Sequence, residues 1–227
     1  MHLTWIGQAG LLFDNGKTKI MVDPYLSSSV EKVAPKNFRR VPVLESLFDA
    51  EPDIMIFTHD HLDHFDPETA QRFFEKNTKA MTVLCPSSVW QKARTYGGEH
   101  NYVQFNRYTE WTESTFRFTA VKAEHSDAYA IGVIIEDTEE KKTYYITGDT
   151  LYSSEILKDL PNDIDVIFLP VNGVGNNMNA VDAERFAKNS GAKAAVPYHI
   201  GMFDELSHDI FKAENKVVLE IYKGKEM

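Results

Sequence analysis

The chain has 227 residues, of which 43% are hydrophobic and 26% charged, proportions that are typical of a globular protein and exclude disordered and fibrous classes. Its 34 acidic residues outnumber its 24 lysines and arginines, and the formal net charge of −10 argues against non-specific binding to nucleic acid or to an anionic membrane surface. A small anionic substrate held by a local cation is still compatible with this charge.

Cysteine usage and the absence of apolar segments indicate the compartment. The only cysteine, Cys85, excludes an intrachain disulfide framework and fits a reducing environment. The N-terminus has no basic segment followed by an apolar core, and no apolar run approaches the roughly 18–20 residues that cross a bilayer. We therefore expect a cytoplasmic protein without a membrane partner, and a single domain over residues 1–227.

The first half of the chain is predicted to start with β-strands and to continue as alternating strands and helices. Asn15-Gly16 favours a hairpin turn, and Asp66 followed by Pro67 is typical of a helix start. A surface loop with one helical turn near residues 44–48 is expected over residues 27–51. The predicted strands cover residues 3–6, 10–13, 19–22, 54–58 and 81–85, and the predicted helices cover residues 66–77 and 87–96.

The second half repeats this order, with strands first and then alternation. Gly191 is predicted to end the helix before it. The predicted strands cover residues 102–105, 115–123, 130–137, 143–147, 166–170, 194–197 and 217–222, and the predicted helices cover residues 153–159, 181–189 and 204–213. Two such halves favour two sheets packed face to face with helices outside, an α+β fold in the form of a four-layer αββα sandwich.

Three imidazoles and a carboxylate lie within six residues at the end of the predicted strand 54–58. They are His59, His61, Asp63 and His64. In an extended chain residues two apart face the same side, so His59 and His61 can point at one metal ion. The alternative is a set of polar residues that decorate a strand end and cap the helix at Asp66.

The segment from His59 to His64 resembles the His-x-His-x-Asp-His motif of the metallo-β-lactamase-fold hydrolases. The resemblance continues in the order expected for that family, with His125, Asp149 and His199 each following an apolar β run. It implies that His59, His61 and His125 bind a first ion and that Asp63, His64 and His199 bind a second. It also implies that Asp149 bridges the two ions, and that Asp63 and Asp149 are the catalytic carboxylates.

Within this superfamily the chain looks most like the L-ascorbate-6-phosphate lactonase-like branch. The resemblance is carried by residues 4–10, 22–24, 170–173, 177–179 and 197–203. The lactonase itself is considerably longer and forms a ring of subunits, so the fold carries over to this chain while the substrate and the assembly do not. A homo-oligomer is one expected assembly.

Four further residues are candidates for supporting the metal site or contacting substrate: Asp23, Asn172, Asn177 and Tyr198. By resemblance Asp23 lies beneath the metal cluster, although an Asp-Pro turn alone would also explain it. The asparagines near residue 177 could contact substrate or simply cap the helix that follows. Cys85 is expected to be a buried structural thiol.

The function expected from these residues is a binuclear metal-dependent hydrolase that uses a metal-bridging hydroxide on an ester, a lactone or a phosphorylated small molecule. Nitrogen and oxygen ligands without thiolate suit Zn, Mn or Fe; the lactonase resemblance favours Mn, and the superfamily as a whole favours Zn. The expected partner is a small, anionic substrate rather than nucleic acid. Two alternatives stay open: a phosphodiesterase of the same fold acting on lipid or nucleotide phosphodiesters, and a non-catalytic metal-binding protein.

Overall fold

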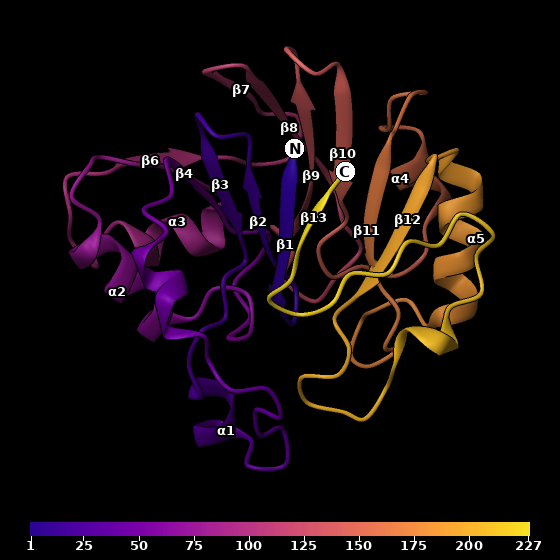
Figure 1. The fold of residues 1–227 in the computed structure, drawn as a ribbon, viewed down its shortest axis with the longest axis horizontal. Coiled ribbons are helices and arrows are strands. Elements are labelled where there is room, and N and C mark those ends of the chain that lie inside the picture. The colour runs from indigo at the N-terminus through magenta and orange to yellow at the C-terminus, as the bar shows by residue number, and fades with distance from the viewer. The chain divides into compact units, whose positions relative to one another are not determined.

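The computed structural model describes all 227 residues, which divide into two compact units, each built around one mixed β-sheet (Figure 1). Unit 1 comprises residues Met1–Gln104, Gly201–Glu205 and Leu219–Met227, and unit 2 comprises Phe105–Ile200 and Leu206–Val218. The organisation as a single domain over residues 1–227 stays a prediction. None of the helices combines the length and the apolar character needed to cross a membrane.

The sheet of unit 1 has seven strands in the order β13-β1-β2-β3-β4-β5-β6. Its strands are β1 (His2–Gly7), β2 (Gly10–Asp14), β3 (Lys19–Val22), β4 (Ile54–Ile56), β5 (Thr82–Cys85), β6 (Asn101–Gln104) and β13 (Gly224–Glu226). Strands β3 to β6 pair in parallel, and the remaining pairs are antiparallel. Because β13 pairs with β1, the two termini lie side by side (Figure 1).

Two helices, α2 (Pro67–Lys76) and α3 (Ser87–Ala93), build the hydrophobic core of unit 1 together with its sheet. Phe73 and Phe74 of α2 are buried with Met55 and Val83 of the parallel strands. These strands are buried along their whole length, which explains why they read as continuous apolar runs. Packing in this core therefore positions β4, and the histidine motif follows β4.

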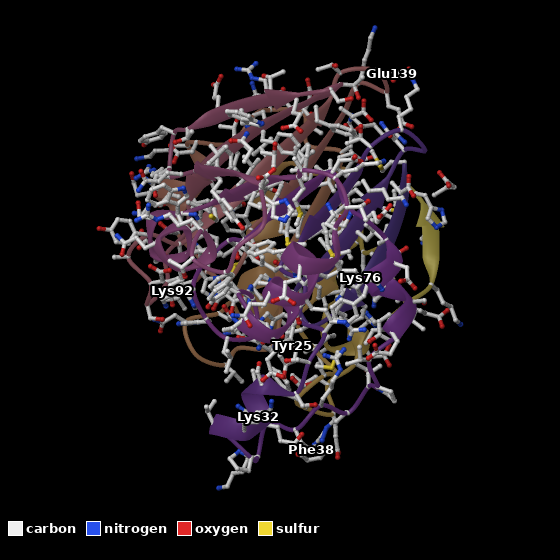
Figure 2. The ribbon with its side chains drawn as sticks, turned by 90° about the vertical axis from the view of Figure 1, so that its left-hand side faces the viewer. Tyr25, Lys32, Phe38, Lys76, Lys92 and Glu139 are labelled. Carbon is white, nitrogen blue, oxygen red and sulfur yellow. The ribbon has the colours of Figure 1, made fainter.

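The segment between β3 and β4 carries a short helix, α1 (Ser29–Val33), and the 3₁₀ helix η1 (Glu45–Asp49). Lys32 and Phe38 lie at the outer end of this segment, beyond Tyr25, as Figure 2 shows. Arg39 ties the segment back to unit 1, because its guanidinium donates to the Tyr25 carbonyl at 2.7 Å and to the Tyr222 hydroxyl at 2.9 Å.

The sheet of unit 2 has six strands in the order β12-β11-β10-β9-β8-β7. Its strands are β7 (Glu110–Glu113), β8 (Phe116–Lys122), β9 (Ile131–Asp137), β10 (Lys142–Ile146), β11 (Val166–Pro170) and β12 (Ala194–Tyr198). Its helices are α4 (Ser154–Leu157), α5 (Ala180–Ser190) and the 3₁₀ helix η2 (His208–Ile210). Strands β10 to β12 are parallel and the others antiparallel, so β8 runs in the same direction as β10.

Most of the predicted elements are confirmed. Asp66 caps α2 by accepting from the Glu68 and Thr69 amides, and Gly191 ends α5 in the left-handed conformation. The turn expected near residues 44–48 is η1. The sequence prediction missed two short elements: α1, which lies inside the expected loop, and the edge strand β7.

The C-terminal elements were predicted wrongly. Over residues 204–213 only η2 is helical, because the backbone finds partners outside a helix: the Asp204 carboxylate accepts from the Gly201 amide, and Glu184 of α5 accepts from the Lys212 amide. Residues 217–222 form no strand and contain a single isolated bridge, between Ile221 and Trp5, and the regular pairing begins two residues later, at β13.

We predict that the thiol of Cys85 does not react in the folded protein. Cys85 is fully buried at the end of β5, and this burial raises the pKa of its thiol, so the reactive thiolate is scarce. A chromogenic disulfide reagent at pH 8 should modify no thiol in the native protein and one thiol per chain in denaturing urea. Stoichiometric modification without denaturant would contradict the position of Cys85 in the core.

Candidate metal centre

In unit 1 the site residues follow the carboxyl ends of neighbouring parallel strands. Asp23 follows β3, and His59 follows β4 after two further residues. The Asp23 amide donates to the carbonyl of Ile56, the last residue of β4, at 2.9 Å, which joins the two strand ends. In open α/β sheets this edge is where ligands bind.

A tight turn between β4 and α2 gathers the rest of the histidine motif. The amides of His64 and Phe65 both donate to the His61 carbonyl, at 3.0 and 2.8 Å. The turn brings the ring of His59 within 4.6 Å of the ring of His61 and within 4.0 Å of that of His64, centroid to centroid. His59 and His64 are fully buried, whereas His61 and Asp63 are partly exposed.

Asp23 orients His64 by direct contact and His59 through the Thr58 hydroxyl. Its carboxylate accepts from the Thr58 amide at 2.8 Å, from the Thr58 hydroxyl at 2.5 Å and from Nδ1 of His64 at 2.8 Å. The Thr58 hydroxyl lies 3.0 Å from Nδ1 of His59. Since the hydroxyl proton goes to Asp23, the Thr58 oxygen accepts from His59. We therefore assign the tautomer with the proton on Nδ1 to both histidines, which leaves Nε2 as the metal-binding nitrogen.

The carboxylate of Asp63 is held by Gln8. The amide Nε2 of Gln8 donates to Asp63 Oδ2 at 2.7 Å, and Gln8 is almost fully buried. Gln8 has a φ of 47° in the turn between β1 and β2, and its carbonyl accepts from the Trp5 indole at 2.9 Å. Sequence reasoning missed this role, as it missed that of Thr58, because 55 residues separate Gln8 from Asp63. The only available signal was that Gln8 lies in the segment 4–10 that carries the family resemblance.

In unit 2 three loops that follow strands of the same direction are hydrogen-bonded to one another. They follow β8, β10 and β11, and they carry His125, Asp149 and Asn172. The Thr150 hydroxyl accepts from the Glu124 amide at 2.9 Å, and the Thr150 carbonyl accepts from the Met178 amide at 2.9 Å. The unit therefore positions its candidate ligands at one edge of its sheet, where His199 follows β12.

Each candidate ligand of unit 2 has a supporting contact. Nδ1 of His125 lies 3.2 Å from the Asn176 carbonyl, an acceptor, so His125 also carries its proton on Nδ1 and presents Nε2. Asp149 is buried, and its Oδ2 accepts from the Asn177 amide at 2.8 Å. Nε2 of His199 lies 3.2 Å from Asp149 Oδ1.

The asparagines that were expected either to contact substrate or to cap a helix have different roles in the structure. Asn172 contacts Nδ1 of His199 at 3.0 Å, and Asn177 holds Asp149, so both support candidate ligands. Asn179 instead caps α5 by accepting from the Asp182 amide. Tyr198 is fully buried at the end of β12, which suits a supporting position rather than direct contact with substrate.

The donor set fits divalent metal ions. The seven side chains named from the sequence are five imidazoles and two carboxylates, and each belongs to a candidate metal-binding group of histidine and aspartate residues. Outer-shell partners of the kind seen here, a carboxylate and a carbonyl that accept from ligand imidazoles, are typical of metal sites. The buried Cys85 is not a member of any of these groups, so the donors are nitrogen and oxygen only.

Comparison with known proteins identifies the family. A family model described as "Beta-lactamase superfamily domain" matches residues 18–200. The chain belongs to this superfamily. A UPF0173 metal-dependent hydrolase of Bacillus mycoides is similar to this chain, with 28% identity over 236 residues that cover 96% of this chain and 92% of the relative. The chain is accordingly placed among the metal-dependent hydrolases of the metallo-β-lactamase fold.

Solved structures agree with this fold. A protein of Veillonella parvula, described as "a possible metal-dependent hydrolase", matches with a TM-score of 0.79, 18% identity and coverage of 100% of this chain and 99% of that one. An isothiocyanate hydrolase from Delia radicum gut bacteria matches with a TM-score of 0.73, 19% identity and coverage of 100% and 99%. The predicted α+β fold class is therefore confirmed, while the resemblance to the lactonase-like branch stays a prediction.

We predict that Asp23→Asn weakens metal binding by about 10- to 100-fold, the usual cost of losing an outer-shell partner. The substituted amide can no longer accept from all three of its donors. Competition with a chromogenic chelator measures the affinity. Thr58→Val, which replaces the hydroxyl with a methyl group, should also weaken metal binding.

Asp66→Asn is the matched control, because Asp66 is equally buried in unit 1 but caps α2, and asparagine caps about as well. Thermal unfolding confirms that each variant is folded. Wild-type metal affinity in both Asp23→Asn and Thr58→Val would contradict the supporting role of this network.

Proposed function

We propose that the protein is a binuclear metal-dependent hydrolase that holds two divalent ions. In this proposal His59, His61 and His125 bind one ion, Asp63, His64 and His199 bind the other, and Asp149 bridges them. The observation that carries the proposal is the set of hydrogen-bond contacts at Nδ1 of His59, His64 and His125, from which we assign the ring proton to Nδ1 and Nε2 to metal binding. The ions are Mn or Zn, and Fe also suits these donors.

Substrate turnover in this site depends on residues that the chain holds in fixed orientations. When bound, the ions would supply an acidified water for attack at neutral pH and positive charge beside the developing oxyanion. Asp63, fixed by Gln8, and Asp149, fixed by Asn177, are the carboxylates that orient the attacking water. The buried surroundings of His59 and His64 limit access of bulk water to the proposed ions from that side.

The proposed substrate is an ester, a lactone or a phosphorylated small molecule. The support is the nitrogen and oxygen donor set, which suits hydrolysis by metal-activated water, together with the acidic charge of the chain, which disfavours nucleic acid. A panel of lactones, 4-nitrophenyl esters and bis(4-nitrophenyl) phosphate separates this proposal from the phosphodiesterase alternative. Turnover confined to the phosphodiester would favour that alternative.

We predict that protein purified without chelator carries two metal ions per chain, and that His61→Ala and Asp149→Ala each lose metal and more than about 100-fold of the hydrolase activity. The loss exceeds that of an outer-shell partner because a direct ligand is removed. Elemental analysis and turnover of the panel substrates are the measurements.

His2→Ala is the control, since His2 is exposed and pairs with Glu226 at the sheet edge of unit 1. Its metal content and activity should equal those of the wild type. Full hydrolase activity without bound metal in His61→Ala or Asp149→Ala would overturn the proposed function, and metal binding without any turnover would favour the non-catalytic alternative.

A further inference from the structure

Unit 2 contains a pocket beside His125. Its volume is about 430 Å³, and its lining includes His125, Arg107, Lys122 and Tyr129. This volume is at the lower end of the range for small-molecule sites, roughly 300–1,000 Å³. The pocket therefore has room for a small molecule but not for a polymer, and a molecule bound in it lies against a proposed metal ligand.

The acidic groups that line the pocket are already engaged. Glu124 forms an ion pair with Lys122. Asp127 caps a local turn, since its Oδ1 accepts from the Tyr129 amide at 2.8 Å and its carbonyl accepts from the Ala130 amide at 3.1 Å. Neither carboxylate therefore needs a cation from a ligand.

The two cationic groups of the pocket retain donors for a ligand. Arg107 directs Nε and Nη2 to one oxygen of Asp159, at 3.2 and 2.7 Å, and this contact orients the guanidinium while its Nη1 group donates to no protein acceptor. The Lys122 ammonium has three donors and only one ion-pair partner, Glu124. Arginine and lysine together are the usual binders of carboxylate and phosphate groups.

Tyr129 adds an apolar wall to this pair of cations. The residue is 55% exposed, and its backbone amide donates to Asp127. The ring can therefore contact a ligand without a rearrangement of the loop that carries it. An aromatic ring beside two cations suits a ligand with a short carbon skeleton that ends in an anionic group.

We propose that this pocket is the recognition site for an anionic group, a carboxylate or a phosphate monoester, on the part of the substrate that does not react. Lys122 and Arg107 bind this anionic group, and Tyr129 packs against the carbon skeleton. The ester, lactone or phosphoryl group to be cleaved then lies on the side of His125. This inference rests on the proposed function, and it narrows the substrate to small molecules that carry an anionic group remote from the scissile bond.

The test compares two esters with the same leaving group, 4-nitrophenyl acetate and the monoanionic 4-nitrophenyl hydrogen glutarate, on the metal-loaded protein. The wild type should favour the glutarate ester, and Lys122→Gln should lower kcat/KM for that ester about tenfold, mainly through KM, because one charge-assisted hydrogen bond is lost. The acetate ester should be unaffected, and Lys122→Arg should restore most of the preference. Arg107→Gln should act like Lys122→Gln.

Lys142→Gln is the matched control, since Lys142 lies on β10 of the same sheet and forms an ion pair with Glu140 outside the pocket. Equal kcat/KM of the wild type and Lys122→Gln for the glutarate ester would overturn the inference, whereas the proposed function would stand on the acetate ester and the metal content.

A binding measurement makes the test independent of turnover. Calorimetric titration with glutarate and with inorganic phosphate distinguishes a carboxylate from a phosphate site, and the preferred anion should bind Lys122→Gln about tenfold more weakly than the wild type. Binding that is unchanged in Lys122→Gln, or absent in the wild type for both anions, would contradict the pocket's role.

Discussion

The buried carboxylate of Asp23 is the constraint on which the candidate histidine ligands of unit 1 depend. A fully buried negative charge is costly unless donors surround it, and here two donors from Thr58 and one from His64 do so. The same contacts join the end of β3 to the end of β4 and fix the tautomers of two histidines. The same set of hydrogen bonds therefore satisfies one buried charge and orients two candidate metal ligands.

In unit 2 neutral groups orient the candidate ligands. Its candidate ligands are supported by asparagine side chains and a backbone carbonyl rather than by a buried carboxylate, as with Asn177 on Asp149 and the Asn176 carbonyl on His125. Residues 172–179 therefore serve three strand ends through one loop. In each unit the candidate ligands follow strands of common direction, so each sheet places its own candidate ligands at one edge.

Sequence reasoning named the candidate ligands from His59 to His64 because they lie together after an apolar run, and it added His125, Asp149 and His199 through the family resemblance. It reached α2 because Asp66 and Pro67 give a helix start with a local cause. Sequence reasoning could not identify Gln8 and Thr58 as residues that orient candidate ligands, because their contacts form only when strand ends that are distant in the sequence come together. It predicted a helix over residues 204–213 from local pattern, whereas Glu184 and Asp204 supply hydrogen bonds that a local pattern does not contain. The fold class and the candidate ligands can thus be predicted from the sequence, whereas the hydrogen bonds that orient the candidate ligands depend on tertiary structure.

The central claim is that prearranged imidazoles bind metal through Nε2. Anomalous diffraction at the metal absorption edge, from crystals of protein purified without chelator, tests it most directly. The account predicts two metal peaks per chain, with Nε2 of His59, His64 and His125 at about 2.0–2.1 Å from a metal if the ion is zinc. The absence of metal peaks near these residues, or coordination through Nδ1 of His59 or His64, would contradict it.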